Sequence, residues 1–228
     1  MNSRAFVPAV LWLVAVSGAA LAEPRRQKLP RWDKFDEEDG ISLFRREVPG
    51  SDVVALRAES VVDAPILRVG SVLTDTERAT EWNRSLKATR IVRRLSDTEY
   101  VRWDHVKGPF FFDRDFVLKV KVELKRKDRQ MVVSFHSVKD PDAPRTHHVR
   151  GELIYGTYVL TSTDGGTKTR VSVELLCDPR SSLKTWMAHK FQRHLAVGTL
   201  SGLRRRVGNP SVPVDPSFVA LLAREGMS

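Results

Sequence analysis

The feature that most constrains this fold is a long succession of strand-like segments that ends in a single long helical segment. Turn residues such as Ser96-Asp97 and Lys127-Asp128 separate these segments at hairpin spacing, so we expect a mostly antiparallel sheet. The expected strands are 86–95, 98–106, 114–126, 130–138, 147–161 and 168–177.

The segment 181–207 predicts one long helix, which begins after Asp178-Pro179 ends the sheet. Apolar residues spaced by four form one ridge of this helix, and Trp186 widens it. The ridge consists of Leu183, Met187, Phe191 and Leu195. Arginines 204–206 favour either stabilisation of the negative helix end or contact with anionic headgroups.

The residues before the main sheet predict two strands and two short helices. We expect strands at 41–48 and 53–62, preceded by a leader that runs into a first short helix near Trp32. Asp63 is expected to cap a helix that has Pro65 in its first turn, and residues 75–82 continue as a second short helix. A sheet with helices on one face is an α+β fold.

The N-terminus predicts a secretory signal peptide over residues 1–22. Arg4 precedes an apolar run, and Ala20-Leu21-Ala22 fits the pattern of a cleavage site. The run is short for a membrane span, although an uncleaved anchoring helix is the alternative. We therefore expect an exported protein, periplasmic or secreted, with a folded domain at 23–207 and a proline-containing tail at 208–228.

The formal net charge of +10 favours anionic partners. Export argues against nucleic acid and for an anionic membrane surface, and solubility alone is the alternative explanation. The single cysteine, Cys177, permits no internal disulfide, and its place at the end of an apolar strand predicts a buried small side chain.

Two strands place polar residues among apolar ones. Alternation in 114–126 puts Phe116 on an inner face and Lys119 in water, so Arg114 is expected on the inner face as well. In the preceding strand we expect Trp103 and His105 to face inward. Polar groups in an apolar wall are typical of a small-molecule pocket. The alternative is a structural ion pair for Arg114 and a core hydrogen bond for His105.

Patterns typical of enzymes and metal sites are missing. His147 and His148 are strand neighbours that point to opposite faces, and His189 and His194 lie about 140° apart around a helix. The sequence contains no glycine-rich phosphate loop after a strand, no HExxH and no nucleophile elbow. We therefore predict no catalytic residue, no metal and no cofactor.

The order of elements and four strings resemble the START family of lipid-transfer domains over residues 30–207. The strings are "DGISLFRREVPGS", "LTDTERATEW", "KGPFFFDRDFVLKVK" and "DPRSSLKTWMAHKFQRHLAVGTLSGLRRRV". The resemblance implies a helix-grip fold, in which a curved antiparallel sheet wraps around the C-terminal helix and leaves a lipid-sized cavity. It makes 23–207 a START-like lipid-binding domain.

The resemblance also implies how the cavity is closed. In the family, the loop before the Arg-Asp pair and the terminal helix line or gate the cavity, which here means Pro109 to Phe112 and Leu183 to Leu203. The Phe-Phe-Phe run departs from the mixed proline and aromatic residues often found in that loop. The identity of the ligand therefore does not transfer.

We expect a monomer that binds, and transfers, a lipid or sterol-like ligand. The expected ligand contacts combine the strand residues, the phenylalanine run and the helix ridge: Trp103, His105, Phe110, Phe111, Phe112, Arg114, Phe116, Trp186, Met187 and Phe191. Two alternatives stay open. One is a cyclase or hydrolase of hydrophobic substrates with His105 as base. The other is an interaction module with the phenylalanine run as partner surface, which a cavity too small for a lipid would favour.

Overall fold

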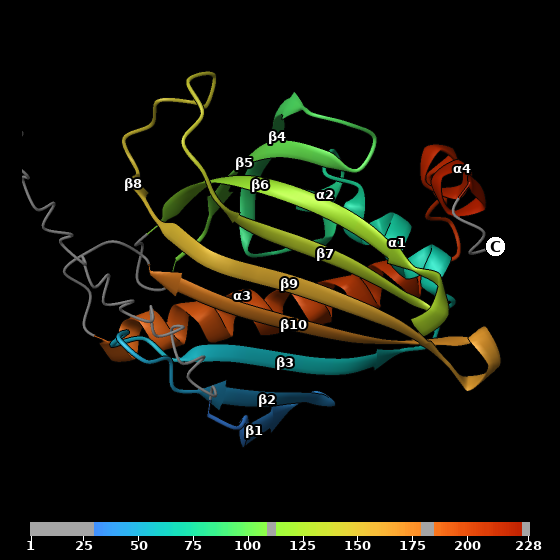
Figure 1. Cartoon of the computed structure of the whole chain (residues 1–228), viewed down its shortest axis with the longest axis horizontal. Helices are drawn as coiled ribbons and strands as arrows, with labels where there is room; N and C mark the ends of the chain where they lie inside the picture. Colours follow the sequence, from blue (N-terminus) through green and yellow to red (C-terminus); the bar gives the residue numbers. More distant parts are fainter. Residues whose placement is uncertain (1–29, 109–112, 179–184, 225–228) are drawn as a thin grey trace, which may run out of the picture.

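The computed structural model describes residues 30–108, 113–178 and 185–224, and one large sheet dominates it (Figure 1). The strands are β1 (Asp33–Glu38), β2 (Ile41–Arg46), β3 (Ala55–Val62), β4 (Leu86–Arg94), β5 (Glu99–Val106), β6 (Arg114–Lys125), β7 (Gln130–Ser137), β8 (Val149–Arg150), β9 (Glu152–Thr163) and β10 (Lys168–Asp178). Their order is β1-β2-β3-β10-β9-β7-β6-β5-β4, and β8 pairs with β6. All pairs are antiparallel except β6 with β8, which confirms the predicted pairing.

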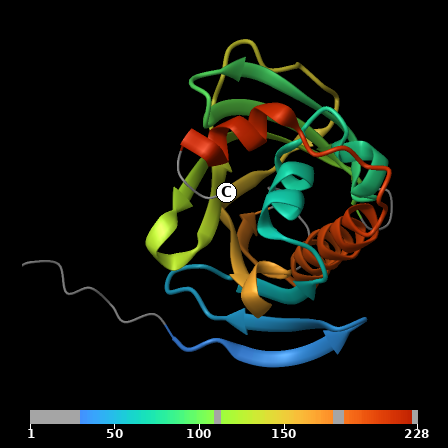
Figure 2. The same cartoon turned by 90° about the vertical axis from the view of Figure 1, so that its right-hand side faces the viewer.

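The helices gather inside the curve of this sheet (Figure 2). They are α1 (Ile66–Thr74), α2 (Ala79–Trp82), α3 (Thr185–Val207) and α4 (Pro216–Arg224). Two short 3-10 turns, Arg126–Asp128 and Asp164–Gly166, close the β6–β7 and β9–β10 hairpins. The long helix α3 contacts β3, β10, α1 and α2. The predicted α+β helix-grip fold is therefore confirmed.

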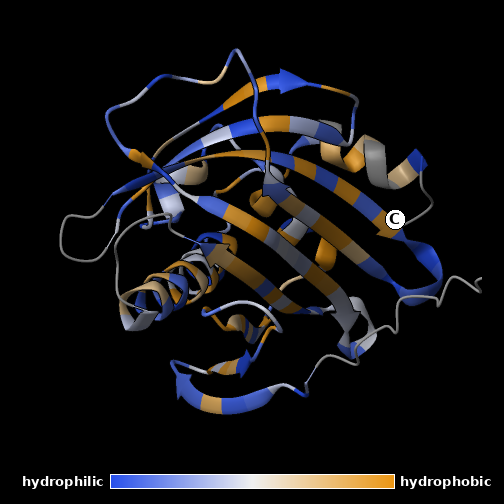
Figure 3. Cartoon of the chain, turned by 60° about the vertical axis from the view of Figure 1, so that its left-hand side comes forward, coloured by the Kyte–Doolittle hydropathy of each residue, from blue (hydrophilic) through white to orange (hydrophobic). Residues whose placement is uncertain are grey.

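Alternation along the strands places the core between the sheet and α3. In β6, Phe116, Leu118 and Val120 are buried, whereas Lys121 and Glu123 are exposed. The same banding of apolar and polar residues is visible along the neighbouring strands in Figure 3. Residues on the inner face pack against buried helix residues that include Phe191, Leu200 and Leu203. Cys177 is fully buried, as predicted.

Three expectations about the N-terminal part are wrong. Residues 33–38 form the edge strand β1 rather than a first short helix, because they pair with β2. The N-cap of α1 is Pro65 rather than Asp63, and no side chain caps it. Asp63 instead forms an ion pair with Lys168. The second short helix covers only Ala79–Trp82.

The C-terminal segment packs onto the domain. Phe218 of α4 is 5% exposed, and its ring and the sulfur of Met131 both lie close to the bare Cα of Gly70. Residues 1–22 and the expected helix start at 181–184 lie outside the described residues. Among the helices that the structure describes, none is both long and apolar enough to cross a membrane.

Arg68 ties the end of α3 to α1. Its guanidinium donates hydrogen bonds to the carbonyls of Val207 (2.8 Å), Val212 (3.2 Å) and Asn209. Val207 is the last residue of α3, and Asn209 and Val212 lie in the turn that follows, so one side chain binds the helix-end carbonyl and two carbonyls of the turn.

We predict that Arg68→Met lowers the free energy of unfolding by about 2–4 kcal/mol, because hydrogen bonds from a charged donor are lost and carbonyls are left unpaired. Chemical denaturation measures the change. Arg205→Met is the matched control, since Arg205 is exposed at the same helix end, and its change should stay within about 0.5 kcal/mol. Equal losses of unfolding free energy in Arg68→Met and Arg205→Met would contradict this role of Arg68.

Candidate functional site

An internal cavity lies between the inner face of the sheet and α3. It consists of two adjoining voids of about 80 Å³ and about 40 Å³. Apolar side chains such as Leu118, Phe135 and Leu175 form much of the wall. The two voids share six lining residues: Asn83, Leu86, Arg102, Phe135, Tyr158 and Thr199. The cavity is therefore apolar with a few polar groups, which is the usual composition of a ligand site.

The strand β5 turns a different face inward from the one that we expected. Arg102 pairs with Leu118 of β6 and Asp104 pairs with Phe116, so both lie on the inner face. Trp103 and His105 pair with Val117 and Asp115 and therefore lie on the outer face. The expected inward orientation of Trp103 and His105 is wrong. The spacing of Arg102 and Asp104 indicates that these opposite charges share a face and can pair, but not whether that face turns inward.

Arg102 and Asp104 form an ion pair inside the cavity. The Arg102 Nη2 lies 2.9 Å from the Asp104 Oδ2, and Thr89 on β4 donates a hydrogen bond of 2.6 Å to the other carboxylate oxygen. The Arg102 side chain is only 17% exposed. Burial acts to lower the pKa of Arg102, but Asp104 together with Tyr100 and Tyr158 outweighs burial and raises this pKa, so the guanidinium stays charged.

Two buried N–H donors belong to residues that line the cavity and have no partner among the residues that the structure describes. The Arg102 Nε and the Trp82 Nε1 are both buried, and neither donates a hydrogen bond within the structure. A buried donor without an acceptor costs about 1–3 kcal/mol. Such groups are uncommon in folded proteins and mark places where an acceptor from outside the chain would be stabilised.

A second polar group of the cavity joins the α2–β4 connection to α3. The Asn83 Nδ2 donates to the Thr199 hydroxyl (3.1 Å), and the Asn83 Oδ1 accepts from the Ser85 N–H (3.1 Å). Burial raises the pKa of Tyr158, although a hydrogen bond with Thr199 partly offsets this. Tyr158 is therefore a neutral phenol that presents a polar atom to an otherwise apolar wall.

The other predicted ligand contacts are distributed around and beyond the cavity. Phe116 lines it and stacks on Phe191 of α3, with ring centroids 6.3 Å apart. Arg114 is buried, as expected for the inner face, but it does not line either void. Its Nη1 donates to the Asp113 carbonyl (2.9 Å), and burial lowers its pKa. Contact of these residues with a ligand stays a prediction.

The ends of the predicted site are less defined. Met187 is half-buried, whereas Trp186, the second residue of α3, is 54% exposed. Phe110, Phe111 and Phe112 lie outside the described residues, as does the whole expected gate from Pro109 to Phe112.

His105 belongs to a network on the outer face of the sheet. Its Nε2 lies 3.0 Å from the Asp113 Oδ2, and its ring stacks on His148 at 4.0 Å. The Lys87 ammonium lies 2.6 Å from the same Asp113 oxygen. The His105 side chain therefore makes a hydrogen bond and a stacking contact. The alternative to ligand binding expected such a hydrogen bond in the core, but it lies away from the cavity. Within residues 30–108, 113–178 and 185–224, no three His, Cys, Asp or Glu side chains are grouped to hold a metal.

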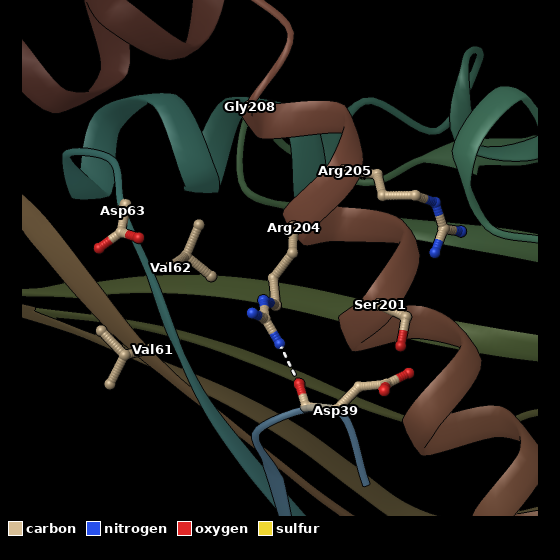
Figure 4. A pocket seen from close by; sticks show the side chains of 8 residues that line it. All are labelled: Asp39, Val61, Val62, Asp63, Ser201, Arg204, Arg205 and Gly208. Atoms are coloured by element: carbon tan, nitrogen blue, oxygen red, sulfur yellow. Dashed lines mark hydrogen bonds between the residues drawn. The ribbon is translucent and has the colours of Figure 1, made fainter.

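A separate surface pocket of about 420 Å³ lies at the end of α3 (Figure 4). Arg204 projects into it and donates to the Asp39 carbonyl (2.5 Å), and Arg205 points away from that contact. Arg206 forms an ion pair with Glu81 (2.6 Å). Asp39 and Asp63 offset the two arginines of the lining, so this pocket carries no excess of positive charge.

Comparisons with known proteins agree with this geometry. The START domain family matches residues 19–211. The human StAR-related lipid transfer protein 5 aligns with a TM-score of 0.70 at 19% identity and covers 76% of this chain and 85% of its own. A StAR-related lipid transfer protein from Xanthomonas axonopodis aligns with a TM-score of 0.66 at 22% identity, covering 78% and 99%. The Zhui aromatase/cyclase from Streptomyces sp. R1128 aligns with a TM-score of 0.50 at 14% identity, covering 67% and 92%.

His189 links the helix that closes the cavity to the sheet. Its Nε2 accepts a hydrogen bond from the Val54 N–H (3.3 Å), which requires an unprotonated Nε2. Burial and the charge of Arg45 lower the pKa of His189. The unfolded chain therefore binds more protons at this residue than the folded chain does.

We predict that His189 contributes stability above its unfolded pKa of about 6.5 and that this contribution is lost as the pH falls from there toward the lower folded pKa. Denaturation curves at pH 7.5, 6.5 and 5.5 test this (about one unit apart, to bracket the unfolded pKa). His189→Gln should lose less stability over this range than the unmodified protein. If the free energy of unfolding of His189→Gln depends on pH as steeply as that of the unmodified protein, His189 does not titrate in this way.

Proposed function

Because this chain belongs to the START domain family, we propose that it binds a neutral lipid or sterol-like molecule in the cavity between the sheet and α3. The family fold supports binding of a hydrophobic ligand. The observation that carries the proposal is the buried Arg102–Asp104 pair, with unpartnered donors beside it, in an otherwise apolar cavity. Displacement of water from the apolar wall would drive binding.

The polar groups of the cavity favour a neutral ligand that accepts hydrogen bonds. Asp104 already balances the charge of Arg102, so an anionic ligand would meet a carboxylate as well as a guanidinium. The free donors are the Arg102 Nε and the Trp82 Nε1, and both need an acceptor oxygen. A hydroxyl, carbonyl or ester oxygen at the end of an apolar body satisfies these conditions.

The size of the cavity adds a condition to this proposal. Voids of about 80 Å³ and about 40 Å³ are far below the roughly 300–1,000 Å³ of typical ligand pockets. Uptake of a lipid therefore requires the walls of the cavity to separate. This small volume also favours the interaction-module alternative, which a protein that takes up no hydrophobic probe would support.

The enzyme alternative receives less support from the site. Among the described residues that line the two voids there is no histidine or cysteine, and Asp104 is bound to Arg102. His105, the expected base, lies on the outer face of the sheet. Binding without catalysis is therefore the activity that we propose.

Export, membrane contact and a monomeric state complete the proposal. The apolar leader pattern of residues 1–22 supports export, and the net charge of +10 supports attraction to anionic lipid. The exposed Trp186 offers an apolar contact at one end of α3.

Vesicle co-sedimentation tests the membrane contact. We expect binding to phosphatidylglycerol vesicles that weakens in Trp186→Ser, and equal binding to neutral vesicles would contradict the proposed contact. Size-exclusion chromatography with light scattering tests the monomer.

We predict that native mass spectrometry after gentle purification finds a hydrophobic ligand, and that the protein takes up NBD-labelled dodecanol more tightly than NBD-labelled dodecanoic acid. The neutral probe offers an acceptor without a buried charge, so we expect a difference of about tenfold or more. An empty protein that takes up neither probe would refute the proposed function.

The double variant Arg102→Leu with Asp104→Leu tests the polar end of the site. Replacing both partners avoids leaving one charge buried alone. We expect the affinity for NBD-labelled dodecanol to fall about tenfold, because hydrogen bonds to charged groups are worth about 1.5–3 kcal/mol. His105→Ala, on the outer face of the same strand, is the control and should bind as the unmodified protein does. Any turnover that depends on His105 would instead support the enzyme alternative.

A further inference from the structure

A hollow of about 600 Å³ lies outside the internal cavity, at the end of the sheet where α4 packs. We name it the α4 groove, and it is lined by the α1–α2 connection, the β4–β5 hairpin and α4, including Thr76, Arg94, Asp97, Tyr100, Phe218 and Arg224. In Figures 1 and 2, α4 lies beside α1, at the opposite end of the molecule from the start of α3. The groove is large enough for a drug-sized ligand, whereas the internal voids are not.

Tyr100 is the residue that the linings of the α4 groove and the internal cavity share. It lines both spaces, and it is 6% exposed. On the sheet it pairs with Arg94, which lines the groove, and it lies on the same face of β5 as Arg102, which lines the cavity. Tyr100 therefore lies where the ligand-sized groove and the internal cavity meet.

The helix α4, which covers the groove, is attached through Phe218, through the residue before its first turn and through its last residue. It has nine residues, too few to be stable as an isolated helix. Phe218 is its buried anchor, and the Asp215 N–H donates to the Ser71 hydroxyl (2.7 Å). The ion pair of Arg224 with Asp97 is well exposed and contributes little. Lifting α4 would expose Phe218 and break the hydrogen bond that Arg126 donates to the Arg224 carbonyl (3.0 Å).

The α4 groove also contains unsatisfied polar groups. The Thr76 hydroxyl is buried without a hydrogen-bond partner, and the residue is 4% exposed. Arg94 forms no ion pair with any residue that the structure describes. Because the lining carries charges of both signs, it does not select a strongly charged ligand. It offers hydrogen bonds to the oxygen of a neutral amphiphile on its way to Arg102.

We propose that the α4 groove is an entrance to the internal cavity. The Tyr100 side chain closes it toward the cavity, and α4 packs over it from outside. The inference rests on the proposed function, since it concerns the same ligand and the same site. An amphiphile would lodge in the groove, displace the Tyr100 ring and reach the Arg102–Asp104 pair. Opening at this end leaves in place the Gln192 hydrogen bonds that dock α3 on the sheet.

A reversible lock tests the entrance. The close contact between residues 71 and 215 makes Ser71→Cys with Asp215→Cys a candidate disulfide that would fix α4 to α1. Cys177 is fully buried and should not exchange. Stopped-flow uptake of NBD-labelled dodecanol should slow about tenfold in the oxidised form, because a closed cover limits access. The reduced form of the same protein is the matched control and should recover the rate.

A second pair of variants opens the cover instead of closing it. Phe218→Asp removes the buried anchor of α4 and should speed uptake about tenfold, whereas Val219→Asp, at an exposed neighbouring position, should not change the rate. Tyr100→Ala should also speed uptake, and Tyr100→Phe, which keeps the ring, should behave as the unmodified protein does.

The outcomes separate the two proposals. If the unmodified protein takes up no probe, the proposed function fails and the entrance fails with it. If the unmodified protein takes up the probe but the oxidised lock and Phe218→Asp both keep its rate, the entrance alone is overturned. Mass spectrometry confirms that the disulfide has formed before the rates are compared.

Discussion

The docking of α3 against the inner face of the sheet is the interaction on which the rest of the structure depends. Gln192 is fully buried between them, where its Oε1 accepts from the Cys177 N–H and its Nε2 donates to the Val54 carbonyl. Gly202 lets the helix backbone approach so closely that a Cβ there would lie 2.3 Å from the Trp82 carbonyl oxygen. Gly202 thus packs α3 tightly on α2, and the sheet and these helices together enclose two small voids.

The same docking explains the chemistry of the cavity. Once helix and sheet exclude water, Arg102 and Asp104 are stable only as a pair, because each charge alone would be costly to bury. The pair leaves the Arg102 Nε unsatisfied, and the tight packing leaves no room for a large group beside it. A compact resting state and a polar site that lacks an acceptor are therefore two consequences of one arrangement. The larger α4 groove, behind Tyr100, offers the space that the cavity lacks.

Much of the fold could be predicted from local pattern. The alternation of β6 located Phe116 and Leu118 in the core, and the hairpin spacings gave the antiparallel neighbours. The residues of the candidate site were harder to predict from the sequence. Arg114 was correctly placed on the inner face, but Trp103 and His105 were not. In β5 both faces carry apolar residues, so alternation alone could not show which set turns toward α3.

The sequence by itself determined the positions of the main strands, the long terminal helix and the antiparallel character of the sheet, because the periods of 2.0 and 3.6 residues are local properties of the chain. Only the tertiary structure decided which face of β5 lines the cavity, since that depends on its register with β6. Tertiary structure also decided that charged residues 33–38 form an edge strand and that Phe218 packs on Gly70. These outcomes depend on contacts between residues far apart in the sequence, which no local pattern records.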